Sequence, residues 1–336
     1  MRNPQSPEPR VPDSLTDTTT IDFAVSLIEA EPWTPTPLLQ VHAIGRRLDA
    51  DVWLKREDCT PIGSFKLRGA VTTAGALASD VPQAGVYVAS AGNYGLAIVY
   101  ACARYGIPVT VVAPEGATAS KLERIRLLGG TVETYGADFD VAKSRAKEKA
   151  SEAGGVFWED GVIEEMATGA GTIATELLRD PEPWDMVVVP LGNGSLIKGI
   201  AQEMKRCSPS TKTIAVVPEG APSMAQALRG QAWDESAAVE TLADGLAVRV
   251  PIPKIVEELT GLVDDVWMVS ESDILPAVKS LMELEQVLAE PSAATPIAAM
   301  AGHRDEIRGK RVAAIVSGAH LSMSLLTELT TTKGLL

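Results

Sequence analysis

Gly63-Ser64-Phe65-Lys66-Leu67-Arg68-Gly69-Ala70 carries more information about fold and chemistry than any other stretch of this chain. Small and apolar residues flank Lys66 on a segment that the sequence predicts to be a loop entering a helix. Shielding from water disfavours the charged form of a lysine and makes its amine a nucleophile, which a lysine that bonds a carbonyl carbon requires. Most lysines are solvated surface charges, so the meaning of this one depends on the motifs found with it.

Two further motifs place small residues between a predicted strand and a predicted helix. Ser90-Ala91-Gly92-Asn93 follows the apolar run 86–89 and precedes a predicted helix at 94–104. Leu191-Gly192-Asn193-Gly194-Ser195-Leu196 follows the apolar run 187–190. A helix start presents free N–H groups and the positive end of the helix dipole, and glycine lets the backbone approach a ligand closely. Each motif therefore predicts an anion site, although one alone is also compatible with an ordinary turn.

Short β-branched runs alternate with longer helical patterns along the chain. The runs lie at 109–113, 131–135, 187–190, 214–217 and 312–316. This alternation is typical of parallel sheets with crossover helices. Such sheets bind ligands beyond the carboxyl ends of their strands. The motifs above fall at such ends, as does Val316-Ser317-Gly318-Ala319-His320, so the sequence predicts an α/β fold with one site formed from them.

Composition limits the classes of partner. Thirty basic residues against 44 acidic ones give 336 residues a net charge of −14, which opposes binding to nucleic acid or an anionic membrane. Three cysteines are too few for a disulfide framework and suit a reducing cytoplasm. The first 20 residues contain no apolar core segment, so we expect a flexible tail over 1–20 and neither a signal peptide nor an anchor.

Taken in order, the motifs resemble the fold type II pyridoxal-phosphate-dependent enzymes, and within them the threonine/serine dehydratase (ammonia-lyase) branch. The resemblance runs from about Thr34 to about Ser324. It also rests on Leu54-Lys55-Arg56-Glu57-Asp58 and on the stretches 218–224, 241–248 and 290–292.

The resemblance implies a fold similar to that of the tryptophan synthase β chain. It has two domains, each a mainly parallel twisted sheet flanked by helices. Residues 81–160 would form a small mobile domain, and 21–80 plus 161–336 a large domain that binds pyridoxal phosphate. The cofactor would lie between the two.

The resemblance also implies a role for each motif. Lys66 would hold pyridoxal 5'-phosphate as a Schiff base and then act as the base at the substrate α-carbon. Asn93 would bond the ring hydroxyl. Ser317 would face the pyridine nitrogen, and because a serine hydroxyl is a weak acid, elimination is favoured over transamination. The expected cofactor-binding residues are Phe65, Lys66, Asn93, Gly192, Asn193, Gly194, Ser195, Leu196 and Ser317. The expected substrate-binding residues are Ser64, Ser90, Ala91, Gly92 and Asn93.

The reaction implied is β-elimination of ammonia and water from a hydroxyamino acid, threonine and/or serine, giving a 2-keto acid. Serine racemases have a second serine where this chain has Ala91, so racemisation is disfavoured. Ala225 stands where metal-binding relatives have an aspartate, so we expect no metal. The family implies a homodimer. Since only residues 321–336 follow the last motif, we expect no C-terminal regulatory domain and no isoleucine feedback through one.

The chain departs from the family pattern at five positions. Tyr94 and Leu96 stand where histidine and glutamine are usual, and His320 replaces a common asparagine. Asn193 and Ser195 interrupt what is often a run of four glycines. The Tyr94 turn is as close to the cysteine-synthase pattern as to the dehydratase one, which leaves the substrate open.

Two alternatives therefore remain. One is a β-replacement synthase of the cysteine-synthase type, in which a second nucleophile captures the same aminoacrylate intermediate. The dehydratase-like stretches 218–224 and 241–248 disfavour it. The other is a pseudoenzyme that binds the cofactor or an amino acid for regulation, which the retention of Lys66, Asn93 and Ser317 together disfavours.

Overall fold

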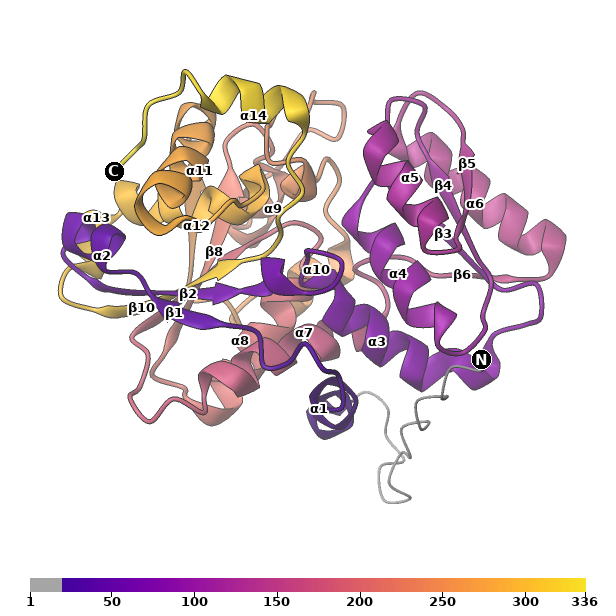
Figure 1. Ribbon diagram of the computed structural model, residues 1–336, viewed down its shortest axis with the longest axis horizontal. Coiled ribbons are helices and arrows are strands. Elements are labelled where there is room, and N and C mark those ends of the chain that lie inside the picture. The colour runs from indigo at the N-terminus through magenta and orange to yellow at the C-terminus, as the bar shows by residue number, and fades with distance from the viewer. Residues whose placement is uncertain (1–19) are drawn as a thin grey trace, which may run out of the picture.

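The computed structural model describes residues 20–336, and two sheets with surrounding helices make up this part of the chain (Figure 1). The predicted flexible tail lies outside the described residues except for Thr20. The hydroxyl of Thr20 accepts a hydrogen bond from the N–H of Phe23 and so caps the first helix, α1 (Ile21–Glu29).

The larger sheet has six strands in the order β1-β2-β10-β7-β8-β9. Their bounds are β1 Leu38–Gln40, β2 Asp51–Arg56, β7 Met186–Pro190, β8 Lys212–Pro218, β9 Asp265–Val269 and β10 Arg311–Val316. β1 runs antiparallel to β2, and the other pairs are parallel. β10 lies between β2 and β7, with Val316 beside Arg56. The loops that follow these strands therefore meet at one edge of the sheet.

The smaller sheet has four parallel strands in the order β5-β4-β3-β6 and lies to the right in Figure 1. The strands are β3 Val86–Ala89, β4 Val109–Ala113, β5 Thr131–Thr134 and β6 Val156–Phe157. The helices between them are α4 Asn93–Ala103, α5 Ala119–Leu127 and α6 Phe139–Ala153. One continuous segment, residues 86–157, therefore forms the smaller sheet. In the sequence this segment lies between strands β2 and β7 of the larger sheet.

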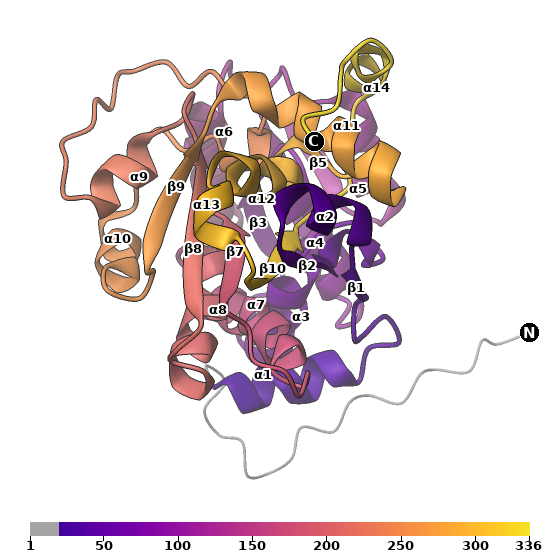
Figure 2. The ribbon, with the colours of Figure 1, turned by 90° about the vertical axis from the view of Figure 1, so that its left-hand side faces the viewer.

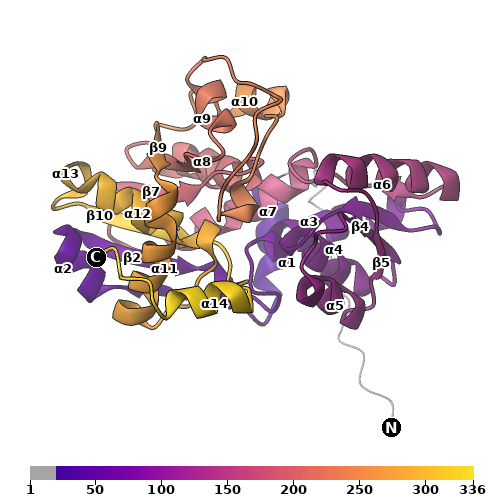
Figure 3. The same ribbon diagram turned by 90° about the horizontal axis from the view of Figure 1, so that it is seen from above.

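Each sheet and the helices packed on it are called a unit below. The remaining helices belong to the larger unit or lie where the two units meet. The α-helices are α2 His42–Leu48, α3 Lys66–Leu77, α7 Glu164–Leu177, α8 Ser195–Cys207, α9 Ser223–Leu228, α10 Pro253–Leu259, α11 Glu271–Glu285, α12 Pro291–Gly302, α13 Arg304–Ile307 and α14 Met323–Leu329. Three 3-10 turns are η1 Glu57–Cys59, η2 Ala78–Asp80 and η3 Asp244–Leu246. Figure 3 shows α3 and α7 where the two units meet. Among the described helices, none is long and apolar enough to cross a bilayer.

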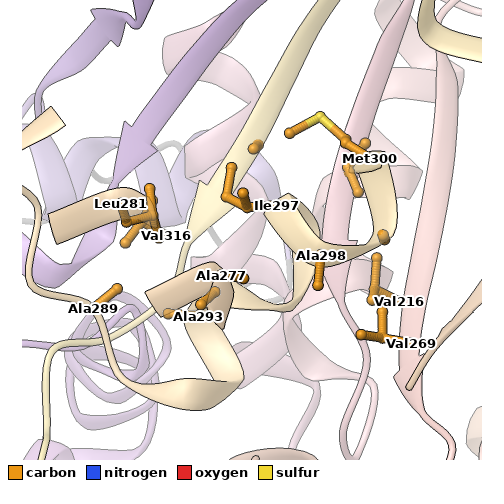
Figure 4. Close-up of a cluster of buried hydrophobic side chains, with 14 of the residues drawn as sticks. Val216, Val269, Ala277, Leu281, Ala289, Ala293, Ile297, Ala298, Met300 and Val316 are labelled. Atoms are coloured by element: carbon orange, nitrogen blue, oxygen red, sulfur yellow. The ribbon is translucent and has the colours of Figure 1, made fainter. Parts of the chain in front are cut away.

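The larger sheet is buried on both faces, which explains its continuous apolar runs. Met186 and Val188 of β7 pack into one cluster with α11 and α12, while Val187 and Val189 pack into another with α7 and α8 (Figure 2). Figure 4 shows part of the first cluster, which includes Ile297 of α12 and Val316 of β10. Alternate residues of a strand point to opposite faces, so both sets must be apolar when helices cover both faces. The predicted α/β class with mainly parallel sheets is confirmed.

Candidate active site

The lysine loop is tied to the turn that follows β10. The N–H of Phe65 donates to the carbonyl of Ser317 at 3.0 Å, and Ser64 forms an isolated antiparallel bridge with Gly318. Lys66 is the first residue of α3. Two motifs separated by about 250 residues in the sequence are thereby held together at the carboxyl edge of the larger sheet.

The Lys66 amine lies among polar groups from three segments. Its Nζ atom is 2.7 Å from each carboxylate oxygen of Asp160 and 3.3 Å from the hydroxyl of Ser195. Only 13% of the Lys66 side chain and 15% of the Asp160 side chain are exposed. Asn193 also donates to Asp160, at 3.3 Å. The predicted lysine and phosphate loop therefore lie in one site, together with a carboxylate that the sequence analysis did not single out.

A simple signal could have identified Asp160. It lies three residues beyond the end of β6, at Phe157, so the carboxyl-end rule that selected the other motifs also applies to it. The strand was missed because it has only two residues.

The Gly192 to Leu196 loop leaves donors free at the start of α8. Gly194 has a φ of +98°, and a Cβ there would lie 2.5 Å from Cγ2 of Ile255. A Cβ on Gly192 would lie 2.6 Å from the carbonyl oxygen of Gly245. Within the described chain, the N–H groups of residues 193–197 donate no hydrogen bond, and Lys198 is the first that does, to Gly194 at 2.9 Å. These free donors and the helix dipole form an anion site beside Lys66.

The Ser90 turn is held by its own hydroxyl. Ser90 Oγ accepts hydrogen bonds from the N–H groups of Gly92, at 3.1 Å, and Gly95, at 2.9 Å. Helix α4 begins at Asn93, one residue before the predicted start, with Gly92 as its N-cap residue. The turn therefore presents backbone N–H groups at a helix start, while its serine hydroxyl has two internal partners.

Glu290 and His320 lie on either side of Asn93. Asn93 Nδ2 is 3.2 Å from each oxygen of the Glu290 carboxyl, and Asn93 Oδ1 contacts His320 Nδ1. Burial and the nearby Asp244 charge raise the pKa of Glu290 to about 7. Burial and the Arg124 and Lys121 cations lower the pKa of His320 to about 4. The sequence analysis quoted Glu290 and His320 but assigned neither of them a role.

Ser317 is 4% exposed at the end of β10, and its hydroxyl has no hydrogen-bond partner among residues 20–336. Although the residue is mostly buried, its Oγ atom is not among the buried oxygens that lack a partner, so the hydroxyl keeps contact with solvent. This hydroxyl can serve one uncharged donor or acceptor of a ligand.

Tyr94 and Leu96, the two departures from the family pattern in this turn, lie in the core of the smaller unit. They are 5% and 0% exposed, and both pack in the cluster that contains Val88 and Ile98. These two side chains therefore contribute to packing, and the turn can meet a ligand only through its backbone and its other residues. The sequence alone could not predict which way these two side chains point, because this depends on how α4 is rotated about its axis against the sheet.

A buried ionic cluster supports the helix that carries Lys66. Arg68 is fully buried and donates to Glu57, at 2.7 and 2.9 Å, and to Glu176, at 2.8 and 2.9 Å. Lys55 also pairs with Glu176. Burial disfavours charge on Arg68, but its two carboxylate partners more than offset this and raise the pKa of the guanidinium. Thr36 adds a hydroxyl, so the first turn of α3 is held through Arg68 by three segments, which contain Thr36, Glu57 and Glu176.

The sequence of the chain matches a known protein family and several characterised proteins. Residues 30–318 match the family model described as pyridoxal-phosphate dependent enzyme. The chain is 35% identical to the L-threonine ammonia-lyase of Thermotoga maritima over 294 residues, 88% of this chain and 73% of that protein. It is also 35% identical to the L-threonine dehydratase biosynthetic IlvA of Escherichia coli over 290 residues, 85% of this chain. The chain spans only 56% of that second protein and 57% of the Haemophilus influenzae dehydratase.

Solved structures agree with the sequence comparison. The processed form of threonine deaminase isoform 2 from Solanum lycopersicum superposes with a TM-score of 0.84 at 32% identity, covering 92% of each chain. Maize serine racemase also gives a TM-score of 0.84, at 29% identity, and covers 92% of this chain and 96% of its own.

Proposed function

Because this chain belongs to the pyridoxal-phosphate-dependent enzyme family, we propose that it is an ammonia-lyase that converts threonine and/or serine to a 2-keto acid and ammonia. One observation carries the proposal. The amine of Lys66 lies beside the free N–H groups at the start of α8, in a chain that shares 35% of its residues with an L-threonine ammonia-lyase. A nucleophilic amine and an anion site in that arrangement suit a phosphorylated aldehyde.

The residues present fit pyridoxal 5'-phosphate. Free N–H donors at residues 193–197 suit its phosphate, and the small residues of the loop allow close approach, since a Cβ at Gly192 or Gly194 would meet other atoms. The unpartnered hydroxyl of Ser317 suits a pyridine nitrogen. When bound, the cofactor supplies an electron sink for the electron pair released at the substrate α-carbon.

Side chains and backbone groups of the chain hold the cofactor, bind the substrate and transfer the proton. Lys66 Nζ would hold the cofactor and then take the α-proton, because this amine lies 3.3 Å from the hydroxyl of Ser195 at the start of α8. Residues 192–196 hold the phosphate. Ser64 and the Ser90 to Asn93 turn bind the substrate carboxylate through the N–H groups at the start of α4. Ser317 is too weak an acid to protonate a ring nitrogen, which favours loss of the β-hydroxyl.

We also retain 81–160 as a small domain that moves toward the rest of the chain and excludes water from the site. All four strands of the smaller sheet fall within this range, which supports the boundary. Closure strengthens charge interactions inside the site. A homodimer in the cytoplasm completes the proposal, and light scattering of the purified protein tests the oligomeric state.

The decisive experiment gives the purified protein threonine or serine as the sole substrate. We expect 2-oxobutyrate from threonine or pyruvate from serine, with equimolar ammonia. Product formed only when a second nucleophile is present would instead establish the β-replacement alternative. No reaction with any β-substituted amino acid, despite bound cofactor, would identify a binding protein.

Lys66→Ala is the matched variant for this experiment. It removes both the attachment point and the α-proton base, so turnover should fall by at least a thousandfold, while the phosphate loop still binds the cofactor without a covalent bond. Absorbance spectra with and without borohydride, followed by peptide mapping of the wild type, check the attachment. Full keto-acid production by the variant would contradict the role of Lys66.

A further inference from the structure

Four side chains form one continuous hydrogen-bonded row across the boundary between the smaller and larger units. Arg124 of α5 contacts Nε2 of His320, whose Nδ1 contacts Oδ1 of Asn93. Asn93 Nδ2 then lies 3.2 Å from each oxygen of Glu290, the residue that precedes α12. Arg124 and Asn93 belong to the 81–160 unit, whereas His320 and Glu290 belong to the rest of the chain.

The contact with Arg124 sets the donor and acceptor roles along this row. A guanidinium has no acceptor, so Arg124 must donate to Nε2 of His320. The proton of a neutral His320 is then on Nδ1, which donates to Oδ1 of Asn93. The amide nitrogen of Asn93 is left facing the two oxygens of Glu290, at least one of which accepts whether or not the carboxyl carries a proton. The orientation of the Asn93 amide is therefore set by Arg124, which acts on it through His320.

Burial and charge keep His320 in the required neutral form. The ring is half-buried, and besides Arg124 it faces Lys121 and Asp244, which pair with each other at 2.8 Å. The two cations disfavour an imidazolium, and Asp244 offsets them only in part, so the pKa of His320 falls to about 4. The backbone N–H of His320 also donates to Glu290 at 3.1 Å, which fixes the ring relative to that carboxyl.

The row has a further anchor on the larger unit. Arg124 Nη2 donates to the carbonyl of Ile62 at 3.3 Å, just before the lysine loop. A Cβ added to Gly63 would lie 3.5 Å from His320 Nε2, so the imidazole packs against the start of that loop. Moving the 81–160 unit away from the larger one would break the contacts of Arg124 with both Ile62 and His320.

We propose that Arg124 and His320 are positioning residues that hold the Asn93 amide in one orientation and couple this orientation to closure of the 81–160 unit. The proposal rests on the proposed function only in taking Asn93 as a contact of the cofactor. With Oδ1 occupied by His320, Asn93 meets a ligand as a donor through the second hydrogen of Nδ2. The structure thereby assigns a role to the histidine that replaces a common asparagine.

Nitrogen-15 spectra of the imidazoles test the row directly, since the chain has only three histidines. In the full-length holoprotein, and again after removal of the cofactor, we expect one histidine to remain neutral with its proton on Nδ1 down to pH 5. His320→Asn should remove that signal. In Arg124→Met the same histidine should lose its single tautomer. Arg126→Met, in the same helix but with an exposed side chain, is the matched control and should leave the signal unchanged.

Cofactor affinity provides a second measurement that does not require turnover. Arg124→Met and His320→Ala should each weaken binding of pyridoxal phosphate about tenfold, and the double variant no more than either single one, because both act through Asn93. His320→Asn retains an amide donor for Asn93 and should recover most of the loss. If turnover is absent but these shifts and affinities behave as described, the proposed function fails and this inference stands.

Three results would overturn the inference. An unchanged His320 signal in Arg124→Met would show that Arg124 does not set the tautomer. Additive losses in the double variant would show that the two side chains act separately. Equal losses in His320→Asn and His320→Ala would indicate that only packing of the imidazole matters.

Discussion

At the scale of single residues, Asp160 binds the Lys66 amine and so competes with an aldehyde for that amine. Both carboxylate oxygens of Asp160 lie 2.7 Å from Nζ in surroundings that are mostly buried. Charge-assisted hydrogen bonds of this kind are short and strong. An amine can attack an aldehyde only after it gives up a proton and leaves its carboxylate partner, so with the role proposed for Lys66 we expect Asp160 to slow attachment of the cofactor.

Asp160→Asn should therefore speed attachment of pyridoxal phosphate about tenfold at neutral pH, since removal of one charge-assisted hydrogen bond is worth about 1.5 kcal/mol. Stopped-flow absorbance after mixing cofactor with stripped protein measures the rate. Glu159→Gln is the matched control, because the neighbouring Glu159 pairs with Lys143 and Lys147 and not with Lys66. Slower attachment in Asp160→Asn would instead mean that the carboxylate assists the amine.

At the scale of elements, helix α3 and the start of α8 are positioned by different physical means. The first turn of α3 depends on the buried cluster of Arg68, Glu57 and Glu176. The start of α8 depends on the left-handed conformation of Gly194, which lets the chain turn into the helix without a Cβ. One is an electrostatic support and the other a steric one, so their substitutions should differ in effect.

Arg68→Met should destabilise the fold by about 3–5 kcal/mol, because it leaves the fully buried Glu57 and the nearly buried Glu176 with too few partners. Urea unfolding measures the loss. The control Arg179→Met breaks an exposed pair with Glu29 and should cost less than about 1 kcal/mol. A loss in Arg68→Met as small as in the control would contradict the cluster's structural role.

Gly194→Ala should weaken cofactor binding at least tenfold, because the new Cβ would lie 2.5 Å from Ile255 in addition to straining a φ of +98°. Gly230 also has a positive φ, of +67°, but no atom lies within 4 Å of a Cβ placed there. Gly230→Ala should thus show the backbone strain alone, about 1–2 kcal/mol of stability, with unchanged affinity. Equal affinities of the two variants for pyridoxal phosphate would exclude a special role for the α8 loop.

At the scale of the whole molecule, the buried Glu290 and the half-buried His320 make the stability of the fold depend on pH in opposite directions. Glu290 has a pKa raised to about 7, so between pH 4.5 and 7 the folded chain holds a proton that the unfolded chain has lost. Stability from this group therefore falls as pH rises through that window. His320 has a pKa lowered to about 4, so its contribution is complete above pH 6.5 and falls as pH decreases toward 4.

Glu290→Gln should remove the first of these slopes. Because the opposite slope of His320 offsets this carboxyl below pH 6.5, wild-type stability should change little between pH 5 and 7. Glu290→Gln keeps only the His320 contribution, so its stability relative to the wild type should rise by on the order of 2 kcal/mol over that range. Urea midpoints at pH 5, 6, 7 and 8 give the comparison. Glu123→Gln, on the exposed face of α5, should follow the wild type. Parallel curves for Glu290→Gln and the wild type would mean that the buried carboxyl does not titrate in this range.

Local patterns in the sequence were enough to predict the α/β class, to select Lys66 as a candidate site residue, and to locate the two turns that begin α4 and α8. Strand and helix periodicities depend on neighbouring residues, so they can be recognised without knowing what lies across the molecule. The predicted helix at 94–104 is α4 at Asn93–Ala103, which begins and ends one residue earlier than predicted. The family likewise followed from motifs in order, and the match over residues 30–318 confirms it.

The tertiary structure alone decided which distant side chains meet at the site. Lys66 pairs with a carboxylate 94 residues away, and Asn93 lies between Glu290 and His320, about 200 residues further along. β10 brings the last of these into place by inserting between β2 and β7, which no local pattern encodes. The same holds for Tyr94, whose burial depends on how α4 packs against its sheet. A contact between distant segments depends on strand order and helix phase, and both are set by the packing of the whole chain.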